Sequence, residues 1–144
     1  MIQPDNFSLH RVTINRLCGY SCVFENTQSG RFTIDSVVSH DDGFTWGSRR
    51  TVYAPPNNRN AGAPQVINVG GRLVTSFMEK DTTNVDGGEM KVVVSTDGGQ
   101  AWGGPTVTGS QGSHWPGLFS ISSSEFLALY SINGKGLVSQ KYQV

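Results

Sequence analysis

Apolar and polar side chains alternate along several short stretches of this chain, as they do in β-strands that bury one face. The clearest alternation runs from Phe32 to Val38 and from Met90 to Val94. Clusters of glycine, serine, asparagine and aspartate separate the stretches, which is typical of turns between strands. The pattern predicts an all-β fold. The predicted strands are 12–17, 21–25, 32–38, 50–53, 65–69, 73–78, 90–94, 105–108, 118–121, 126–130 and 136–142.

One eight-residue pattern occurs twice, directly after the two alternating runs. Residues 39–46 read SHDDGFTW and residues 95–102 read STDGGQAW, 56 residues further along. Each copy lies where a hairpin must turn. The aspartate can accept amide protons across the turn, the glycine supplies a positive φ, and the tryptophan folds back as an apolar plug. A corner repeated at this period predicts radially repeated four-stranded sheets, which are the blades of a β-propeller.

Counting strands along the chain predicts a single partial propeller domain over residues 1–144 with about three antiparallel blades. The blades cover about 9–54, 63–108 and 115–144. The first two have four strands each, and the third lacks its outer strand. Propellers commonly take that strand from the other end of the chain. We therefore interpret the sequence as the C-terminal half of a ring of about six blades.

This topology separates the loops into two groups, with the repeated corners at one end of the blades and the longer loops at the other. Function is expected at the end with the longer loops, at the mouth of the central channel. When the second strands of the three blades are aligned at their ends, Glu25, Met78 and Tyr130 take equivalent positions at that mouth. Glu25 is the main catalytic candidate because it follows an apolar run, where partial burial would control its protonation. A surface glutamate or a partner for Arg31 is the alternative.

Other polar and aromatic side chains near the same mouth are candidates for binding a substrate. Each also has a structural explanation, since asparagines suit turns, aromatic side chains suit the core, and a histidine can have a structural role. Glu79 and Asp81 could supply a second carboxylate, although a solvated cluster of loop charges explains them better. The substrate-binding candidates are Arg59, Asn60, His114, Trp115 and Tyr130.

Composition narrows the classes of function. The chain has 11 basic and 11 acidic side chains, so it lacks the charge excess expected of a protein that binds nucleic acid or an anionic membrane. No apolar run is long enough to cross a bilayer, and residues 1–10 lack the features of a signal peptide, so localisation stays unknown.

Cys18 and Cys22 flank a predicted turn and form either a disulfide or two buried thiols. Without ligand spacing we expect no metal and no cofactor.

The eight-residue pattern resembles the Asp-box of the sialidase superfamily. In that superfamily the box is structural and lies away from the active site. The resemblance therefore implies a scaffold role for both copies. The residues concerned are Ser39, Asp41, Gly43 and Trp46 in the first copy and Ser95, Asp97, Gly99 and Trp102 in the second.

Longer segments resemble the C-terminal half of the exo-arabinanases of glycoside hydrolase family 93. The resemblance implies a six-bladed ring and a secreted, retaining enzyme that releases arabinobiose from α-1,5-linked arabinan without a metal. Retention needs two carboxyl groups about 5 Å apart. Glu25 is similar to one of that pair, and the other is expected on an upstream blade. The segments are 23–26, 31–34, 39–49, 60–66, 71–78 and 115–118.

Two other functions remain open. An exo-sialidase needs three arginines that converge on the substrate carboxylate and a Tyr–Glu nucleophile pair. Arg59 and Arg31 are available for this, whereas Arg49, Arg50 and Arg72 fall toward the wrong face or on outer strands. The second alternative is a non-catalytic carbohydrate-binding or interaction module. Half a ring leaves blade surfaces uncovered, so such a module is expected to self-associate.

Overall fold

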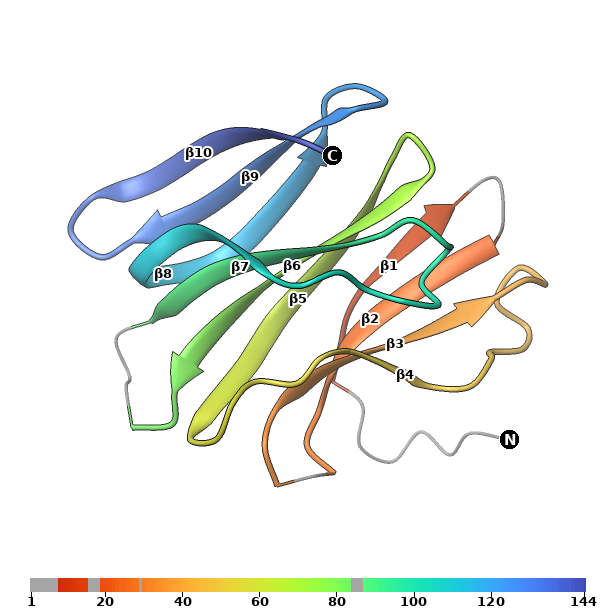
Figure 1. The fold of residues 1–144 in the computed structure, drawn as a ribbon, viewed down its shortest axis with the longest axis horizontal. Helices are drawn as coiled ribbons and strands as arrows, with labels where there is room; N and C mark the ends of the chain where they lie inside the picture. The colour runs from red at the N-terminus through yellow and green to blue at the C-terminus, as the bar shows by residue number, and fades with distance from the viewer. Residues whose placement is uncertain (1–7, 16–18, 29, 84–86) are drawn as a thin grey trace.

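The computed structural model describes residues 8–15, 19–28, 30–83 and 87–144, and for 8–15 only the backbone is considered. These residues form strands, turns and irregular segments without a helix, which confirms the all-β prediction (Figure 1). The ten strands are β1 Ser8–Asn15, β2 Gly19–Asn26, β3 Thr33–Ser39, β4 Arg50–Tyr53, β5 Arg59–Val69, β6 Arg72–Asp81, β7 Gly88–Ser95, β8 Thr106–Ser120, β9 Glu125–Ile132 and β10 Gly136–Gln143.

The strands form two antiparallel sheets that together make a partial β-propeller, as predicted. The first sheet has the order β1-β2-β3-β4 and is one complete blade. The second has the order β10-β9-β8-β7-β6-β5 and contains two blades. They share β8, whose first part pairs with β7 as an outer strand and whose second part pairs with β9 as an inner strand. In the described part of the chain, the third blade therefore has three strands.

The continuity of β8 differs from the prediction of two strands with a loop over 109–116. The strand bends without breaking because two glycines allow close approach and a positive φ. A Cβ on Gly109 would lie 2.9 Å from the Cβ of Met90, and Gly112 has a φ of 89°. The side chain of Gln111 donates to the carbonyl of Gly87 at 3.2 Å, which fixes the bend to the preceding blade.

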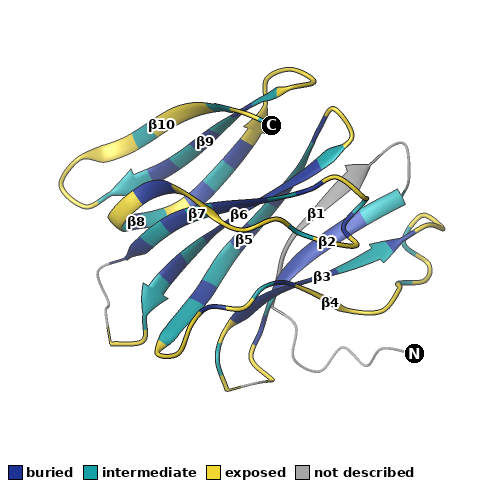
Figure 2. Ribbon diagram, viewed as in Figure 1, coloured by how far each residue is buried: buried dark blue, intermediate teal, exposed yellow. Residues whose placement is uncertain are grey.

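Two apolar cores lie between the blades (Figure 2). The first joins blade one to blade two and includes Val23, Ile34, Val66, Leu73 and Phe77. The second joins blade two to blade three and includes Val69, Val74, Leu118, Phe126 and Ala128. Burying each large apolar side chain contributes about 1.5–3 kcal/mol, so contact between neighbouring blades is the main source of stability.

The first Asp-box closes the hairpin between β3 and β4 through its own side chains. Asp41 Oδ1 accepts hydrogen bonds from the Ser39 hydroxyl and the Thr45 amide, each at 2.8 Å. Asp41 Oδ2 accepts from the Thr45 hydroxyl at 2.6 Å, and the Gly43 amide donates to Ser39 Oγ at 2.9 Å. The bonds from Thr45, followed by the one from Ser39, lower the pKa of Asp41 to about 2.

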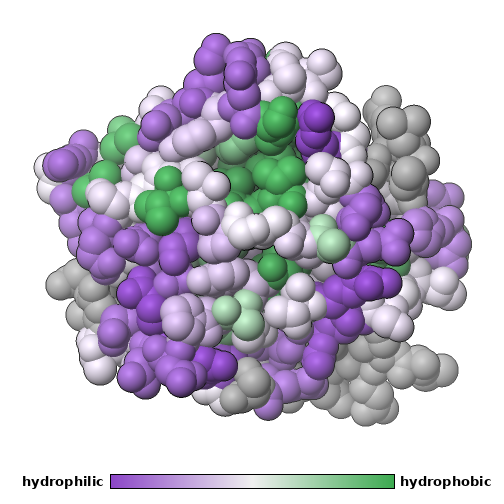
Figure 3. Space-filling model, viewed as in Figure 1, coloured by the Kyte–Doolittle hydropathy of each residue, from purple (hydrophilic) through white to green (hydrophobic). Residues whose placement is uncertain are grey.

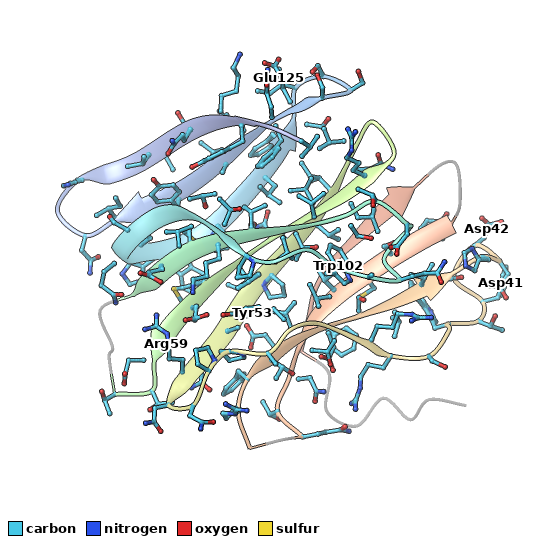
Figure 4. The ribbon with its side chains drawn as sticks, in the orientation of Figure 1. Asp41, Asp42, Tyr53, Arg59, Trp102 and Glu125 are labelled. Atoms are coloured by element: carbon cyan, nitrogen blue, oxygen red, sulfur yellow. The ribbon has the colours of Figure 1, made fainter. Side chains whose placement is uncertain are left out.

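The second Asp-box repeats this arrangement between β7 and β8. Asp97 Oδ1 accepts from the Ser95 hydroxyl at 2.8 Å and from the amides of Gln100 and Ala101 at 2.9 Å each. The amide of Gly99 donates to Ser95 Oγ at 2.9 Å, and Gly99 has a φ of 90°. Trp102, the tryptophan of the second box, packs against the first interblade core. In the first box, Asp41 and Asp42 lie at the tip of the hairpin between β3 and β4 (Figure 4).

The thiol of Cys22 is free and buried, and burial raises its pKa to about 11. It is therefore protonated at neutral pH. Cys18, the other half of the disulfide considered from the sequence, lies outside the described residues.

The first testable prediction concerns the Asp-box. Asp41→Asn should lower the melting temperature at pH 7, because the amide loses acceptor capacity toward Ser39 and Thr45. The pKa of Asp41 is lower in the folded state, so its stabilisation is present above the ordinary pKa of about 4 and disappears as the pH falls through about 2. Thermal unfolding between pH 7 and pH 2 should show the difference from wild type shrinking. Asp42→Asn is the matched control, and an equal loss in that variant would contradict the account.

Candidate functional site

The inner strands of neighbouring blades share a local irregularity at the end opposite the Asp-boxes. In β5 the pairing shifts between Gly62 and Gln65, and in β8 it shifts between His114 and Gly117. Each bulge holds a non-glycine residue at a φ of 52°, followed directly by a proline. Such a backbone costs on the order of 1–3 kcal/mol, and residues held in this way are enriched at active sites and ligand-binding sites. The two residues are Ala63 and Trp115.

Glu25 lies against the first of these bulges. It is on β2 of blade one, and its Oε1 accepts a hydrogen bond from the backbone amide of Ala63 at 2.6 Å. A Cβ at position 62 would stand 2.9 Å from the same oxygen, so Gly62 makes room for the carboxylate. Glu25 is only partly buried. The strained bulge thus holds the carboxylate of a partly buried glutamate in one position.

Trp115 occupies the corresponding position of the next blade. Its side chain is 76% exposed, which is unusual for a tryptophan beside a buried strand. Gly62 pairs with Met78 in blade two, and His114 pairs with Ser131 in blade three. Trp115 and Ala63 therefore lie at the same level of adjacent blades, and the rim they share carries one carboxylate and one exposed aromatic ring.

Tyr130 does not lie at this level, which corrects the alignment made from the sequence. The residue opposite His114, level with Met78, is Ser131. Tyr130 instead continues a series with Phe24 and Phe77 that recurs every 53 residues. All three are buried, with exposed fractions of 2%, 0% and 6% along the chain. The predicted strand ended at residue 130, whereas β9 continues to Ile132, so aligning the strand ends placed Tyr130 one residue away from the level of Glu25 and Met78.

The polar groups of Arg59 and Asn60 are engaged within the protein. Asn60 Oδ1 accepts from the Phe32 amide at 3.1 Å, which ties β5 to blade one. The guanidinium of Arg59 pairs with Glu79 and lies 3.7 Å from Glu89. Both side chains thus hold blades or strands together, in addition to any contact with a ligand.

Glu79 is the centre of a buried polar network, whereas the sequence suggested a solvated cluster. Its side chain is only 2% exposed; it accepts from the Tyr53 hydroxyl, pairs with Arg59, and lies 2.9 Å from Lys91 Nζ. Burial raises its pKa, but bonds from Tyr53 and Lys91 and the charges of Lys91 and Arg59 outweigh burial and lower the pKa overall. Figure 4 labels Tyr53, at the end of β4, and Arg59, at the start of β5.

Asp81, the other acidic residue considered in this region, behaves as a turn residue. Its carboxylate accepts from the amide and hydroxyl of Thr83 at 2.9 and 2.7 Å. These two bonds lower its pKa. Asp81 therefore stabilises the end of β6 and is not part of the buried network.

His114 lies in the β8 bulge beside the rim. Its Nε2 is buried and has no hydrogen-bond partner among the described residues. A Cβ at position 87 would stand 2.6 Å from that nitrogen, so Gly87 is packed against the ring. A buried ring nitrogen without a protein partner is costly, and a water or a ligand hydroxyl would satisfy it.

Comparisons with known proteins do not extend this description. No protein-family model matches the chain, and no curated protein matches it. Within residues 8–15, 19–28, 30–83 and 87–144, no three His, Cys, Asp or Glu side chains are grouped as metal ligands. No helix in those ranges could span a membrane.

The second prediction concerns the Glu79 network. Glu79→Gln should reduce the free energy of unfolding at pH 7 by about 3 kcal/mol, because it leaves buried cationic groups uncompensated. The lowered pKa means that this stabilisation is present above the ordinary pKa of about 4.3 and is lost as the pH falls below it. Denaturant unfolding at pH 7 and pH 3 measures both. Glu89→Gln, at the exposed side of the network, should cost much less, and an equal cost would contradict the central role of Glu79.

Proposed function

We propose that this chain is the C-terminal part of a retaining glycoside hydrolase of the sialidase superfamily that releases arabinobiose from α-1,5-linked arabinan. The observation that carries the proposal is the position of Glu25, which is anchored by the Ala63 amide at a strained bulge of the channel rim. A fixed and partly exposed carboxylate is what a glycosidase requires of a catalytic group.

In the proposed mechanism Glu25 is one member of a carboxylate pair. In a retaining reaction one carboxylate attacks the anomeric carbon while the other protonates the leaving oxygen, and a water then displaces the enzyme. The family resemblance assigns the second carboxylate to an upstream blade. Trp115, exposed on the adjacent bulge, would supply an aromatic platform for a sugar ring.

The network around Glu79 argues against the exo-sialidase alternative. Tyr53 and Glu79 form a Tyr–Glu contact, but burial and the hydrogen bond to Glu79 raise the pKa of Tyr53, which disfavours a nucleophilic phenolate. Arg59 is paired with Glu79, so part of its guanidinium is already engaged by a carboxylate within the protein. This Tyr–Glu pair therefore fits a structural role.

The third prediction tests Glu25. The chain alone should hydrolyse debranched arabinan weakly or not at all, because one carboxylate cannot perform both steps. Joined to an N-terminal half that restores the ring, it should release arabinobiose with retained configuration. Glu25→Gln should then remove most of kcat with little change in KM. A reducing-sugar assay measures the rate.

Glu125→Gln is the matched control for this test, since Glu125 lies on β9 in a partly exposed pair with Lys141. It should leave activity unchanged. Full activity of Glu25→Gln would exclude Glu25 from the pair, and preference for sialyl-lactose over arabinan would favour the sialidase.

The alternative of an interaction module is favoured by one uncovered face. Phe119 and Ile121 are the fourth and sixth residues after Trp115, the bulge residue of β8. Ile67 and Val69 are the fourth and sixth residues after Ala63, the bulge residue of β5. Ile67 and Val69 pack in the second interblade core, whereas Phe119 and Ile121 are 53% and 50% exposed. This equivalence supports a blade-like partner, and we propose a second copy of the chain as that partner.

A second opening lies where an outer strand of blade three would pack. Val92, Phe126 and Tyr142 line a groove of about 140 Å³ between blades two and three. Figure 3 shows apolar atoms gathered on this side of the molecule, near the C-terminus. The edge of β10 is unpaired in the described structure, which leaves hydrogen-bonding groups available for another strand.

The fourth prediction tests self-association. Sedimentation velocity should show dimers or larger species for wild type, and Phe119→Ser combined with Leu137→Ser should shift the distribution toward monomer. Both side chains are exposed, at 53% and 75%, so the fold should survive. Phe44→Ser, at an 87% exposed residue of the first Asp-box, is the control. A wild type that is monomeric at all concentrations would contradict the proposal.

A further inference from the structure

A groove lies between blades one and two at the Asp-box end. Its volume is about 780 Å³, within the range of about 300–1,000 Å³ common for ligand sites. One wall comes from the hairpin of the first Asp-box with Trp46 and Arg50, and the other from the second Asp-box with Thr96 and Gln100. The two repeated corners thus form one cleft, a role that bracing each hairpin does not require.

The chemistry of the lining suits a neutral, hydroxyl-rich ligand. Trp46 provides an apolar ring, and Arg50, Thr96 and Gln100 provide hydrogen-bonding groups. The carboxylates of Asp41 and Asp97 also line the groove, but both accept hydrogen bonds within their own boxes. The groove thus has the exposed cation of Arg50 beside two carboxylates that are hydrogen-bonded within their own boxes. This combination gives no strong preference for a charged ligand.

Ser36 gives an independent indication of a ligand. It lines the same groove, its side chain is 2% exposed, and its hydroxyl has no hydrogen-bond partner in the part of the chain that the structure describes. An unsatisfied buried hydroxyl costs about 1–3 kcal/mol. A hydroxyl of a bound ligand, reached directly or through a water, would remove that cost.

The groove is separate from the rim that carries Glu25. Tyr20, at the start of β2, pairs with Ser39 of the first Asp-box, and Glu25 lies five residues further along the same strand. At about 3.3 Å per residue, the Asp-box end of the groove is roughly 17 Å from Glu25, whereas its inner end at Ser36, which pairs with Val23, is two residues from Glu25 along the strand. A ligand held by Trp46, at the Asp-box end of the groove, therefore does not occupy the rim.

We propose that this groove is a second, non-catalytic binding site for the polysaccharide, with Trp46 stacking on a sugar ring and Arg50 donating to its hydroxyls. The identity of the polymer rests on the proposed function, so arabinan is the ligand expected. A site of this kind would hold the chain on the polymer between catalytic events and raise the local concentration of chain ends.

Native gel electrophoresis through debranched arabinan tests the site, with retardation against polymer concentration giving an apparent Kd. Wild type should be retarded, and Trp46→Ala and Arg50→Ala should each raise the apparent Kd about tenfold. Arg50 is exposed, so Arg50→Ala should fold even if Trp46→Ala weakens the Asp-box. Melting temperatures of both variants are measured alongside.

Trp115→Ala and Glu25→Gln are the matched controls because both residues lie on the rim. They should leave most of the retardation in place. Retardation that is lost in Trp115→Ala and unchanged in Arg50→Ala would overturn the groove and leave the proposed function intact. No retardation of wild type would also overturn the groove, whereas the proposed function is decided by the separate hydrolysis assay.

Discussion

Each blade of this chain is a single layer of strands, and its stability depends on a neighbouring blade covering its apolar face. Blade two shows this on both sides, since Phe77 faces blade one and Val74 faces blade three, each with an exposed fraction of 0%. Among the described residues, both apolar cores are built from residues of two neighbouring blades. The same constraint explains why Phe119 and Leu137 are exposed on blade three, where the described structure has no further blade.

Close packing of blades also determines where strain is stored. The inner strands β5 and β8 each carry a bulge, and the bulges bring Ala63 and Trp115 into a left-handed conformation. At the first bulge the Ala63 amide is satisfied by Glu25 from the neighbouring blade. The contact that compensates for the bulge thus also positions the proposed catalytic carboxylate.

The sequence predicted the blades well because alternation and the two Asp-boxes are local signals. Most strands lie within a few residues of the stretches predicted from them, as with β4, Arg50–Tyr53. It did not predict that β8 is continuous, because glycines that usually mark loops here permit a bend. The burial of Glu79 was also missed, since its partners Tyr53 and Lys91 are distant in sequence and converge only when blades pack. The level of Tyr130 was also wrong, because β9 continues to Ile132, beyond the strand end expected at residue 130, whereas the catalytic role of Glu25 stays a prediction.

Amide hydrogen exchange at Ala63 tests most directly whether Glu25 is held at the channel rim by the neighbouring blade. In wild type this amide should exchange slowly, because it donates to Glu25 Oε1 at 2.6 Å. In Glu25→Ala it should exchange much faster, while amides in the interblade core, such as that of Val74, keep their protection. Rapid exchange at Ala63 in wild type, or an unchanged rate in Glu25→Ala, would contradict the account.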